Sequence, residues 1–335
     1  MTPPARQPLL EVEGLTKSYP IRSGLLQRPS GELRALDGVS FTVGRGEAFG
    51  LVGESGCGKT TAARCILRLV APTSGTVTFD GVDVLGLDAE ALRKLRRRLQ
   101  IVFQDSSGAL DGRMTVRQLL EEPLVIHGLH SRAERSARVD AILELIGLRP
   151  ELAARKPHQF SGGQRQRIGL ARALILEPEL IVLDEPISAL DVSVQAQVLN
   201  LIKDLQRAMG LTYVFIVHDL TIAELFCDRI AVLYLGRVVE TAEATELFHN
   251  PQHPYTVSLI SAVPAPDGAG GAARRRIVLS GEVSPVGGGP RRGCPFRPRC
   301  PVGRDRRRCA EETPELGPAG AGHRFACHYP GELTA

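Results

Sequence analysis

The stretch EAFGLVGESGCGKTT, residues 47–61, decides the fold of this chain. Its first six residues, 47–52, form a short apolar run in front of a glycine and predict a buried strand. After the glycine loop, an apolar pattern of helical period continues to about Val70 and predicts a helix. The loop matches G-x-x-x-x-G-K-[ST], and it has the strand before it and the helix after it that this motif requires.

The residue types of this loop suit a polyphosphate. Glycines let successive backbone N–H groups point inward, and the following helix adds the positive end of its dipole. Lys59 would reach the β- and γ-phosphates, Thr60 would place its hydroxyl on Mg²⁺, and Thr61 would donate one more hydrogen bond. A plain glycine turn before a helix is the alternative interpretation. The residues expected to bind the nucleotide are Gly53, Glu54, Ser55, Gly56, Cys57, Gly58, Lys59, Thr60 and Thr61.

The rest of the chain predicts an α/β fold. Short apolar runs typical of strands alternate with helical segments, which is the pattern of a mostly parallel sheet covered by helices. We expect the strands at 99–103, 180–184, 212–217 and 230–235, and the helices at 164–177 and 193–209.

Two regions depart from this alternation. The β-rich pieces at 9–15 and 35–43 predict a small antiparallel layer, with a loop of Gly, Ser, Pro and Arg at about 20–34 between them. Residues from about 105 to 165 show helical periodicity from Thr115 onward and no strand signal, so they predict a helical insertion.

The run LIVLDE, residues 180–185, ends in two acids. Its strand would place both carboxylates at its carboxyl end, where ligands bind in open α/β sheets. Asp184 would hold Mg²⁺ through its water shell, and Glu185 would polarise the attacking water as general base. Paired acids at a strand end are also common turn formers, which is the alternative reading.

The order of the motifs along the chain is diagnostic. After the phosphate loop come Gln104 behind a strand, the run SGGQ at 161–164, the two acids, the run SALD at 188–191, and His218. This order resembles the ATP-binding cassette (ABC) ATPases, and the resemblance covers about residues 9–262 with these motifs intact. It implies a P-loop NTPase cassette that hydrolyses ATP with Mg²⁺, built of a RecA-like core, an antiparallel β layer and a helical subdomain.

In that family two cassettes pack head to tail and bind two ATP molecules at their interface. A serine cap and glycine N–H groups at a helix start form an anion site, and the same chain cannot fill it. The resemblance therefore implies contacts to the nucleotide held by the partner's phosphate loop from Ser161, Gly162, Gly163, Gln164 and Asp191.

The resemblance implies roles for three more residues. Gln104 would ligate Mg²⁺ and sense the membrane subunit, and His218 would hydrogen-bond the γ-phosphate and the attacking water. Tyr19 would stack on adenine, although the loop at 20–34 lengthens its distance from the phosphate loop. Cys57 replaces the serine common at its position, and we expect activity to survive because such positions contribute mainly backbone donors.

The runs RVVE at 237–240 and LFHNPQHPYT at 247–256 are similar to the end of the cassette in oligopeptide and dipeptide importers, a branch that also covers nickel importers. This likeness implies an ATP-driven motor at the cytoplasmic face of the cell inner membrane, held by two permease subunits whose coupling helix would meet residues 105–150. It also implies a second, related ABC ATPase or a homodimer, and indirectly an extracytoplasmic substrate-binding protein. The cargo would be di- or oligopeptides, with nickel or another small solute as the alternative.

From about residue 263 the composition changes. Residues 263–335 hold twelve arginines against seven acidic residues and are rich in Pro and Gly, so we expect a cassette at 1–262 and an irregular extension at 263–335. Four thiolates there could bind Zn²⁺ or a [4Fe–4S] cluster, or remain unligated. The extension resembles the cysteine extension of the peptide-importer branch, which implies an iron–sulfur cluster for some members. The cysteines concerned are Cys294, Cys300, Cys309 and Cys327.

Composition argues against several other classes. The longest apolar stretches have about six or seven residues, whereas a membrane-spanning helix needs ~20. The first 30 residues lack the pattern of a secretory signal, so we expect a cytoplasmic location. A net charge of +4 is too mild to indicate nucleic-acid binding. A single cassette without a long insertion also disfavours a soluble ABC ATPase that acts on nucleic acid or the ribosome.

Overall fold

The computed structural model describes residues 7–23, 28–104, 106–188, 190–263, 276–280, 292–319 and 322–333. Several sequence predictions include residues outside these ranges. These residues are 1–6 of the expected cassette, 24–27 of the expected loop, 105 of the expected helical insertion, Ala189 of the SALD run, and 264–275, 281–291, 320–321 and 334–335 of the expected extension. The chain divides into two compact units. The first unit holds Gly44–Glu47 and Gly86–Ile216, and the second holds Pro8–Val43, Ala48–Leu85 and the chain from Val217 onward.

The first unit is built on three parallel strands. β7 (Leu180–Asp184) pairs on one side with β6 (Leu99–Val102) and on the other with β8 (Thr212–Val217). Every residue of β7 and β8 is buried, which is why both read as unbroken apolar runs. Because the strands are parallel, the residues that follow β6 and β7 lie at one edge of this sheet.

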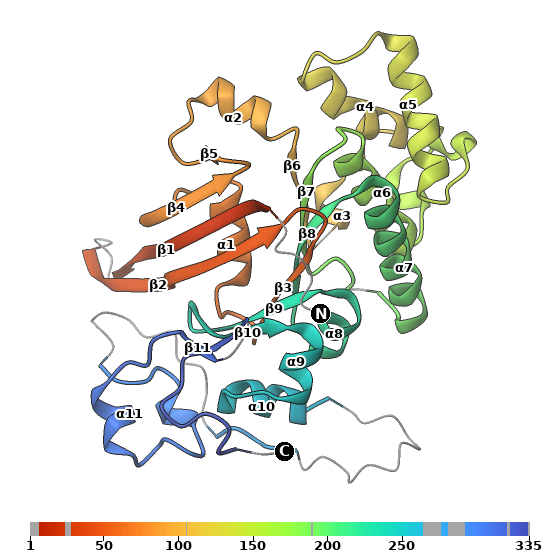
Figure 1. The fold of residues 1–335 in the computed structure, drawn as a ribbon. Helices are drawn as coiled ribbons and strands as arrows, with labels where there is room; N and C mark the ends of the chain where they lie inside the picture. The colour runs from red at the N-terminus through yellow and green to blue at the C-terminus, as the bar shows by residue number, and fades with distance from the viewer. Residues whose placement is uncertain are drawn as a thin grey trace. The chain divides into compact units, whose positions relative to one another are not determined.

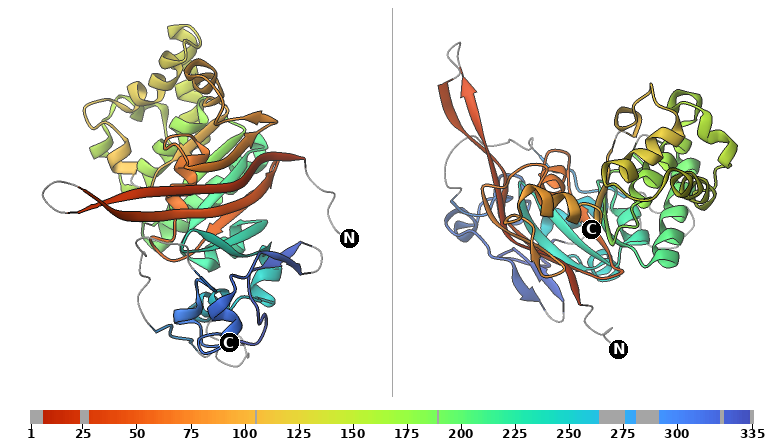
Figure 2. Two further views of the ribbon diagram at one scale, coloured as in Figure 1. Left: turned by 90° about the vertical axis from the view of Figure 1, so that its left-hand side faces the viewer. Right: turned by 90° about the horizontal axis from the view of Figure 1, so that it is seen from above.

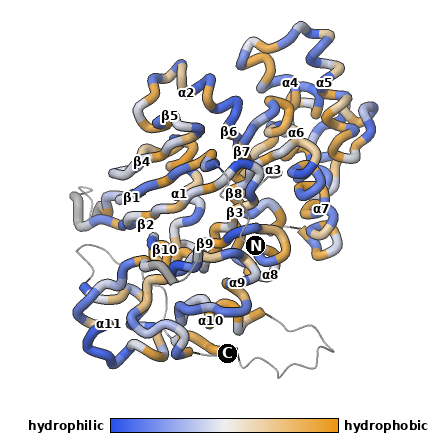
Figure 3. Tube along the Cα trace, viewed as in Figure 1, coloured by the Kyte–Doolittle hydropathy of each residue, from blue (hydrophilic) through white to orange (hydrophobic). Residues whose placement is uncertain are grey.

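Helices make up the rest of the first unit (Figure 1). α4 and α5 both begin with a capping box, Thr115 with Gln118 and Ser131 with Glu134, which satisfies N–H groups that a helix start leaves unpaired. Hydrophobic and hydrophilic residues are mixed along α4 (Figure 3), and the buried ones, Val116, Leu119, Leu120 and Leu124, recur with helical spacing. The helices are α2 (Ala89–Leu95), α3 (Ser106–Ala109), α4 (Val116–Ile126), α5 (Arg132–Leu145), α6 (Gly162–Leu174) and α7 (Val192–Met209), with 3₁₀ turns at Pro150–Ala154 and Pro157–Gln159.

The second unit holds an antiparallel layer and a mixed sheet. The layer has the order β2-β1-β4-β5, and β1 and β2 run side by side over most of their length (Figures 1 and 2). In the mixed sheet, β3 pairs with β9 in parallel, and β10, β12 and β11 continue from β9 as antiparallel strands. The strands are β1 (Pro8–Ser23), β2 (Arg28–Gly44), β3 (Ala48–Val52), β4 (Ser74–Phe79), β5 (Val82–Asp83), β9 (Arg229–Tyr234), β10 (Arg237–Glu243), β11 (Gly317–Ala319) and β12 (His323–Phe325).

The helices of the second unit are short. Residues 292–319 and 322–333, here called the C-terminal segment, contribute one short helix, one 3₁₀ turn, and the strands β11 and β12. The helices are α1 (Lys59–Ile66), α8 (Leu220–Phe226), α9 (Ala244–His249), α10 (Pro254–Ser261) and α11 (Arg307–Glu311), with a 3₁₀ turn at Arg297–Arg299. Within the described ranges, no helix combines the length and apolarity needed to cross a membrane.

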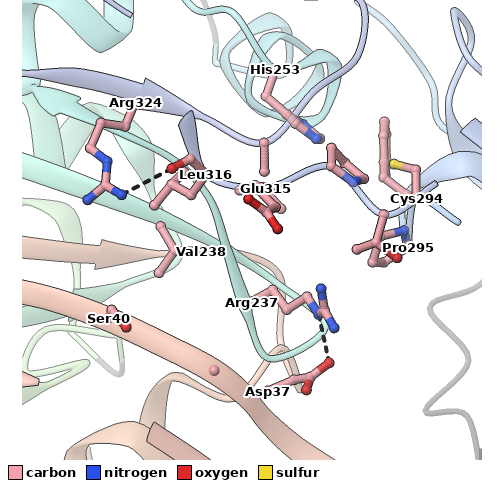
Figure 4. A pocket seen from close by; sticks show the side chains of 16 residues that line it. Asp37, Ser40, Arg237, Val238, His253, Cys294, Pro295, Glu315, Leu316 and Arg324 are labelled. Atoms are coloured by element: carbon pink, nitrogen blue, oxygen red, sulfur yellow. Dashed lines mark hydrogen bonds and ion pairs between the residues drawn. The ribbon is translucent and has the colours of Figure 1, made fainter. Parts of the chain in front are cut away.

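A cavity of about 450 Å³ lies in the second unit, where the C-terminal segment meets β2 and β10 (Figure 4). At one side Arg237 forms an ion pair with Asp37 at 2.6 Å, and at the other Arg324 donates to the carbonyl of Leu316 at 3.0 Å. No phosphate-loop residue lines this cavity. The C-terminal segment is thus folded against the strands of the unit instead of extending away from them.

Two expectations from the sequence differ from the structure. The loop expected at about 20–34 is largely strand, because β1 continues to Ser23 and β2 begins at Arg28. The helix expected to reach Val70 ends at Ile66, and the chain turns into β4, which the sequence did not predict. β2 lies at the edge of its layer, where charged residues such as Arg and also Pro are tolerated, so composition alone placed the loop too widely.

Candidate functional site

The phosphate loop lies between β3 and α1 and depends on its glycines. Gly53, Gly56 and Gly58 have φ of 157°, 79° and 111°, a backbone region that residues with a side chain rarely adopt. Gly58 is the N-cap of α1, and a Cβ there would lie 2.5 Å from the carbonyl oxygen of Ala35. The backbone at Gly58 therefore lies so close to that of Ala35 that only glycine fits there.

Lys59 is folded back over the loop. It is 5% exposed, and its Nζ donates to the carbonyl oxygens of Gly53 at 2.7 Å and Glu54 at 3.0 Å. Cys57 is buried beneath it, and burial raises the pKa of that thiol. The backbone of Cys57 is fixed by its own N–H, which donates to Glu54 O, and by its carbonyl, which accepts from Gly236 N. Cys57 thus stabilises the loop through its buried side chain and its two backbone hydrogen bonds.

The outer face of the loop suits an anion. Ser55 and Gly56 are exposed, and Thr60 and Thr61 are half-buried at the start of α1. Helix N-terminal N–H groups, hydroxyls and an ammonium group are the donors that phosphate oxygens accept from. Tyr19 lies in β1 of the same unit, where Lys17 Nζ sits 5.0 Å from the centre of its ring.

The structure brings Gln104 and Glu185 together at one edge of the first unit's sheet. Gln104 follows β6 and Glu185 follows β7, and Gln104 Nε2 donates to Glu185 Oε2 at 2.8 Å. Asp184, the last residue of β7, is 3% exposed. Glu185 has φ 47°, a left-handed conformation that costs a non-glycine residue of order 1 kcal/mol or more. Its N–H donates to Ile216 O at 3.0 Å, and this bond helps to hold the strained residue in place.

The run SGGQ begins α6 as a capping box. Ser161 is exposed, and its Oγ accepts from Gln164 N at 3.3 Å while Gln164 Oε1 accepts from Ser161 N at 3.0 Å. Gly163 is buried, and a Cβ there would collide with Cγ1 of Val194 in α7. Asp191, the exposed N-cap of α7, belongs to the same unit. The glycine thus lets two helix starts pack closely while the serine stays at the surface.

His218 and its neighbour come directly after β8. His218 is exposed, and Asp219 caps α8 by accepting from Thr221 N at 2.8 Å. The cap fixes the chain direction one residue after the histidine.

Two contacts to the phosphate loop escaped the sequence analysis. Glu54 N donates to the hydroxyl of Tyr255 at 2.9 Å, and Arg299 donates to both oxygens of the Glu54 carboxylate at 2.7 and 3.0 Å. These partners lie 201 and 245 residues away in sequence, so no local pattern links them to the loop. The resemblance of the run LFHNPQHPYT at 247–256 gives no indication that Tyr255 contacts the phosphate loop.

The four cysteines of the C-terminal segment do not form a metal centre. They line one small cavity, but in the part of the chain that the structure describes no group of three or more His, Cys, Asp or Glu side chains could hold a metal ion. Burial raises the pKa of Cys294 to about 11 and that of Cys327 to about 12. The iron–sulfur prediction, and with it the metal-binding role of Cys294, Cys300, Cys309 and Cys327, is therefore wrong.

Two family models match the chain. Residues 36–188 match the model described as ABC transporter, which covers the phosphate loop, SGGQ and both acids. Residues 239–309 match the model described as oligopeptide/dipeptide transporter, C-terminal region. The second match runs from β10 into the C-terminal segment.

Similar proteins cover nearly the whole chain. The oligopeptide transport ATP-binding protein AppF of Bacillus subtilis is 49% identical over 98% of this chain and 99% of its own. A putative peptide import ATP-binding protein of Brucella ovis is 51% identical over 96% of this chain and 97% of its own. Among solved structures, the dimeric ATP-binding cassette MJ0796 bound to ADP and Pi matches with a TM-score of 0.62 and 33% identity, over 70% of this chain and 98% of that one.

Proposed function

The chain belongs to the ABC transporter family, and on that premise we propose that it is the ATP-hydrolysing motor subunit of a membrane importer for peptides. The support for hydrolysis is the phosphate loop together with the Gln104–Glu185 pair. The support for peptides is that relatives matched over nearly their full length are named for peptide transport or import. Those names favour peptides over nickel, the alternative cargo.

The single observation that carries the catalytic role is the hydrogen bond between Gln104 and Glu185 at 2.8 Å. It fixes the Glu185 carboxylate at the carboxyl edge of parallel strands, where Glu185 can take a proton from an attacking water. Lys59 and the loop N–H groups bind the β- and γ-phosphates of ATP. His218, exposed after β8, hydrogen-bonds the γ-phosphate and the water.

The oxygen donors of this chain fit Mg²⁺. The cation prefers carboxylate, amide and hydroxyl oxygens, and Asp184, Gln104 and Thr60 offer these types. When bound, Mg²⁺ supplies positive charge to the phosphate oxygens. Asp184 is almost fully buried, so it holds a fixed position for the water shell of the cation.

We place a second cassette opposite the SGGQ corner. Ser161 is exposed and Gly162 is half-buried at the start of α6, and the N-terminal end of a helix favours an anion. The dimeric state of MJ0796 supports the same arrangement here, with Ser161, Gly162, Gly163, Gln164 and Asp191 contacting ATP held by the partner. The partner is a related ABC ATPase or a second copy of this chain.

A groove of about 280 Å³ in the first unit is the surface that we assign to the permease. Its lining includes Phe103 and Ile126, which are 39% and 59% exposed, and Val125, which precedes Ile126 in α4, is 54% exposed. Exposed apolar side chains gathered around a groove are typical of a protein interface. Two permease subunits would hold the motor at the cytoplasmic face of the cell membrane and receive the peptide from a substrate-binding protein outside.

Replacement of Glu185 tests the catalytic assignment. Glu185→Gln keeps the shape of the side chain but removes the base, so we expect ATP binding to persist while turnover falls by about 10² or more. Glu144→Gln, an exposed position on α5, is the matched control and should hydrolyse ATP as the wild type does. Unchanged turnover in Glu185→Gln would contradict the assignment of Glu185 as base.

Uptake assays test the cargo. Cells that lack the gene for this chain should lose uptake of labelled peptides, and the wild-type gene should restore it while Glu185→Gln should not. If the same cells instead lost uptake of labelled nickel and kept that of peptides, the peptide assignment would be wrong.

A further inference from the structure

We infer that Arg299 of the C-terminal segment is a positioning residue for ATP binding, which acts by neutralising and fixing the Glu54 carboxylate inside the phosphate loop. The pair is bidentate, with Nη1 donating to Oε2 at 2.7 Å and Nη2 to Oε1 at 3.0 Å. A planar guanidinium facing both oxygens of a carboxylate is the strongest geometry for such a pair. The Arg299 side chain is 9% exposed and that of Glu54 30%, so water screens this pair only partly.

Aromatic side chains of the second unit hold Arg299 next to the phosphate loop. Its guanidinium carbon lies 6.0 Å from the ring centre of Tyr234, and Phe296, three residues earlier, packs edge-on against Tyr234 at 5.1 Å. Tyr255 packs against both rings, at 4.7 Å from Tyr234 and 5.5 Å from Phe296. The aromatic cluster therefore fixes the 3₁₀ turn Arg297–Arg299 with its last arginine aimed at the loop.

The same cluster also holds the backbone of Glu54. The Tyr255 hydroxyl accepts from Glu54 N at 2.9 Å, while the Glu54 carbonyl accepts from Lys59. Glu54 is thus bound through its N–H, its carbonyl and its carboxylate at once. Three fixed points on one residue leave the second position of the loop little freedom to move.

Charge explains why this matters for the nucleotide. ATP brings several negative charges to a loop that contains one acid of its own, and like charges a few ångströms apart repel strongly where water is partly excluded. An unpaired Glu54 carboxylate could also accept from the loop N–H groups and compete with phosphate. Arg299 removes both effects, so the C-terminal segment makes the phosphate loop a better anion site.

The inference rests on the proposed binding of ATP at this loop, and nucleotide binding by the purified full-length chain tests both. The probe is a fluorescent ATP analogue, titrated in the presence of Mg²⁺. We expect Arg299→Ala to raise the Kd about fivefold at low salt, and the effect to shrink at high salt because screening weakens the repulsion. Arg307→Ala is the matched control, since Arg307 lies in the same segment with an exposed ion pair to Glu311 and should bind as the wild type does.

The decisive variant is the double replacement Arg299→Ala with Glu54→Gln. If Arg299 acts by neutralising Glu54, the second change removes the unpaired charge and restores the Kd to within about twofold of the wild type. A merely structural arginine would leave the double variant as weak as Arg299→Ala, and that result would overturn the inference. Wild-type affinity in Arg299→Ala would also overturn it while leaving the proposed function intact. A wild-type chain that does not bind the analogue would remove both.

Discussion

Glu240 and His323 form a buried ion pair whose loss should release the end of the chain. Glu240 in β10 is fully buried, and its carboxylate accepts from Gln252 N at 2.7 Å, His253 N at 3.0 Å and His323 Nε2 at 2.7 Å. His323 lies in β12, the strand that pairs with β10. One carboxylate therefore joins the C-terminal segment to the loop before α10.

Glu240→Ala would leave Nε2 of His323 and the N–H groups of Gln252 and His253 without their acceptor. Breaking a buried pair by removing one partner costs about 3–5 kcal/mol. At 1.36 kcal/mol per tenfold change, hydrogen-exchange protection at residues 323–325 should fall by roughly two to four orders of magnitude. Hydrogen exchange with mass spectrometry measures this directly, with peptides from β7 as the internal control.

The pair also predicts a pH dependence. The hydrogen bond to Glu240 raises the pKa of His323, with a further contribution from Glu246, whose Oε1 lies 3.4 Å from Nδ1. A raised pKa in the folded state means that the stabilisation is complete below about 6.5, the pKa of an unfolded histidine, and is lost as the pH rises through the folded value. Protection at 323–325, corrected for intrinsic exchange rates, should therefore fall above pH 6.5. Constant protection from pH 6 to 9 would refute the reasoning, as would wild-type protection in Glu240→Ala.

Two other predictions concern the nucleotide site. Gly163→Ala gains about 1 kcal/mol of helix propensity but loses about 1–3 kcal/mol to the collision with Val194, so thermal unfolding should show net destabilisation. Adding Val194→Ala should relieve the collision, and Gly112→Ala, which has open space around its Cα, is the control. Cys57 is 2% exposed, and burial raises the pKa of its thiol. At pH 8 an alkylating reagent should therefore modify Cys57 at least about tenfold more slowly in the native chain than in denaturant. Equal rates would contradict the burial of this side chain.

Much of the core followed from the sequence because its signals are local. The strands β3, β7 and β8 are buried along their whole length, and each contains an apolar run of four or five residues. The glycines of the phosphate loop and the SGGQ cap are equally local, since a helix start is decided within four residues. These features could be placed to within a residue or two.

What the sequence did not reveal is the pairing of distant residues. Glu240 ends the RVVE run, and nothing near it in the sequence indicates that it pairs with His323, 83 residues later. For the four cysteines the sequence suggested a metal site that the described residues do not form. Their presence in one segment suggested a shared metal ion, which their arrangement in the described residues does not support. Composition identifies side chains that could bind a metal. Whether they come close enough together to do so depends on tertiary packing, which the spacing of the residues in the sequence does not determine.

The Oγ atom of Ser161 can serve both the fold and the binding of a ligand, because it accepts one hydrogen bond and can donate another. The oxygen accepts a hydrogen bond from the N–H of Gln164 in the first turn of α6. Its own hydroxyl hydrogen can still be donated to an acceptor outside the chain. An aspartate would cap the helix about as well and would survive any screen for stability, yet it has no hydrogen to give and would turn a negative charge toward an incoming anion. Replacement of Ser161 by aspartate should therefore change the stability of the fold little and should weaken the binding of an anionic group at this surface.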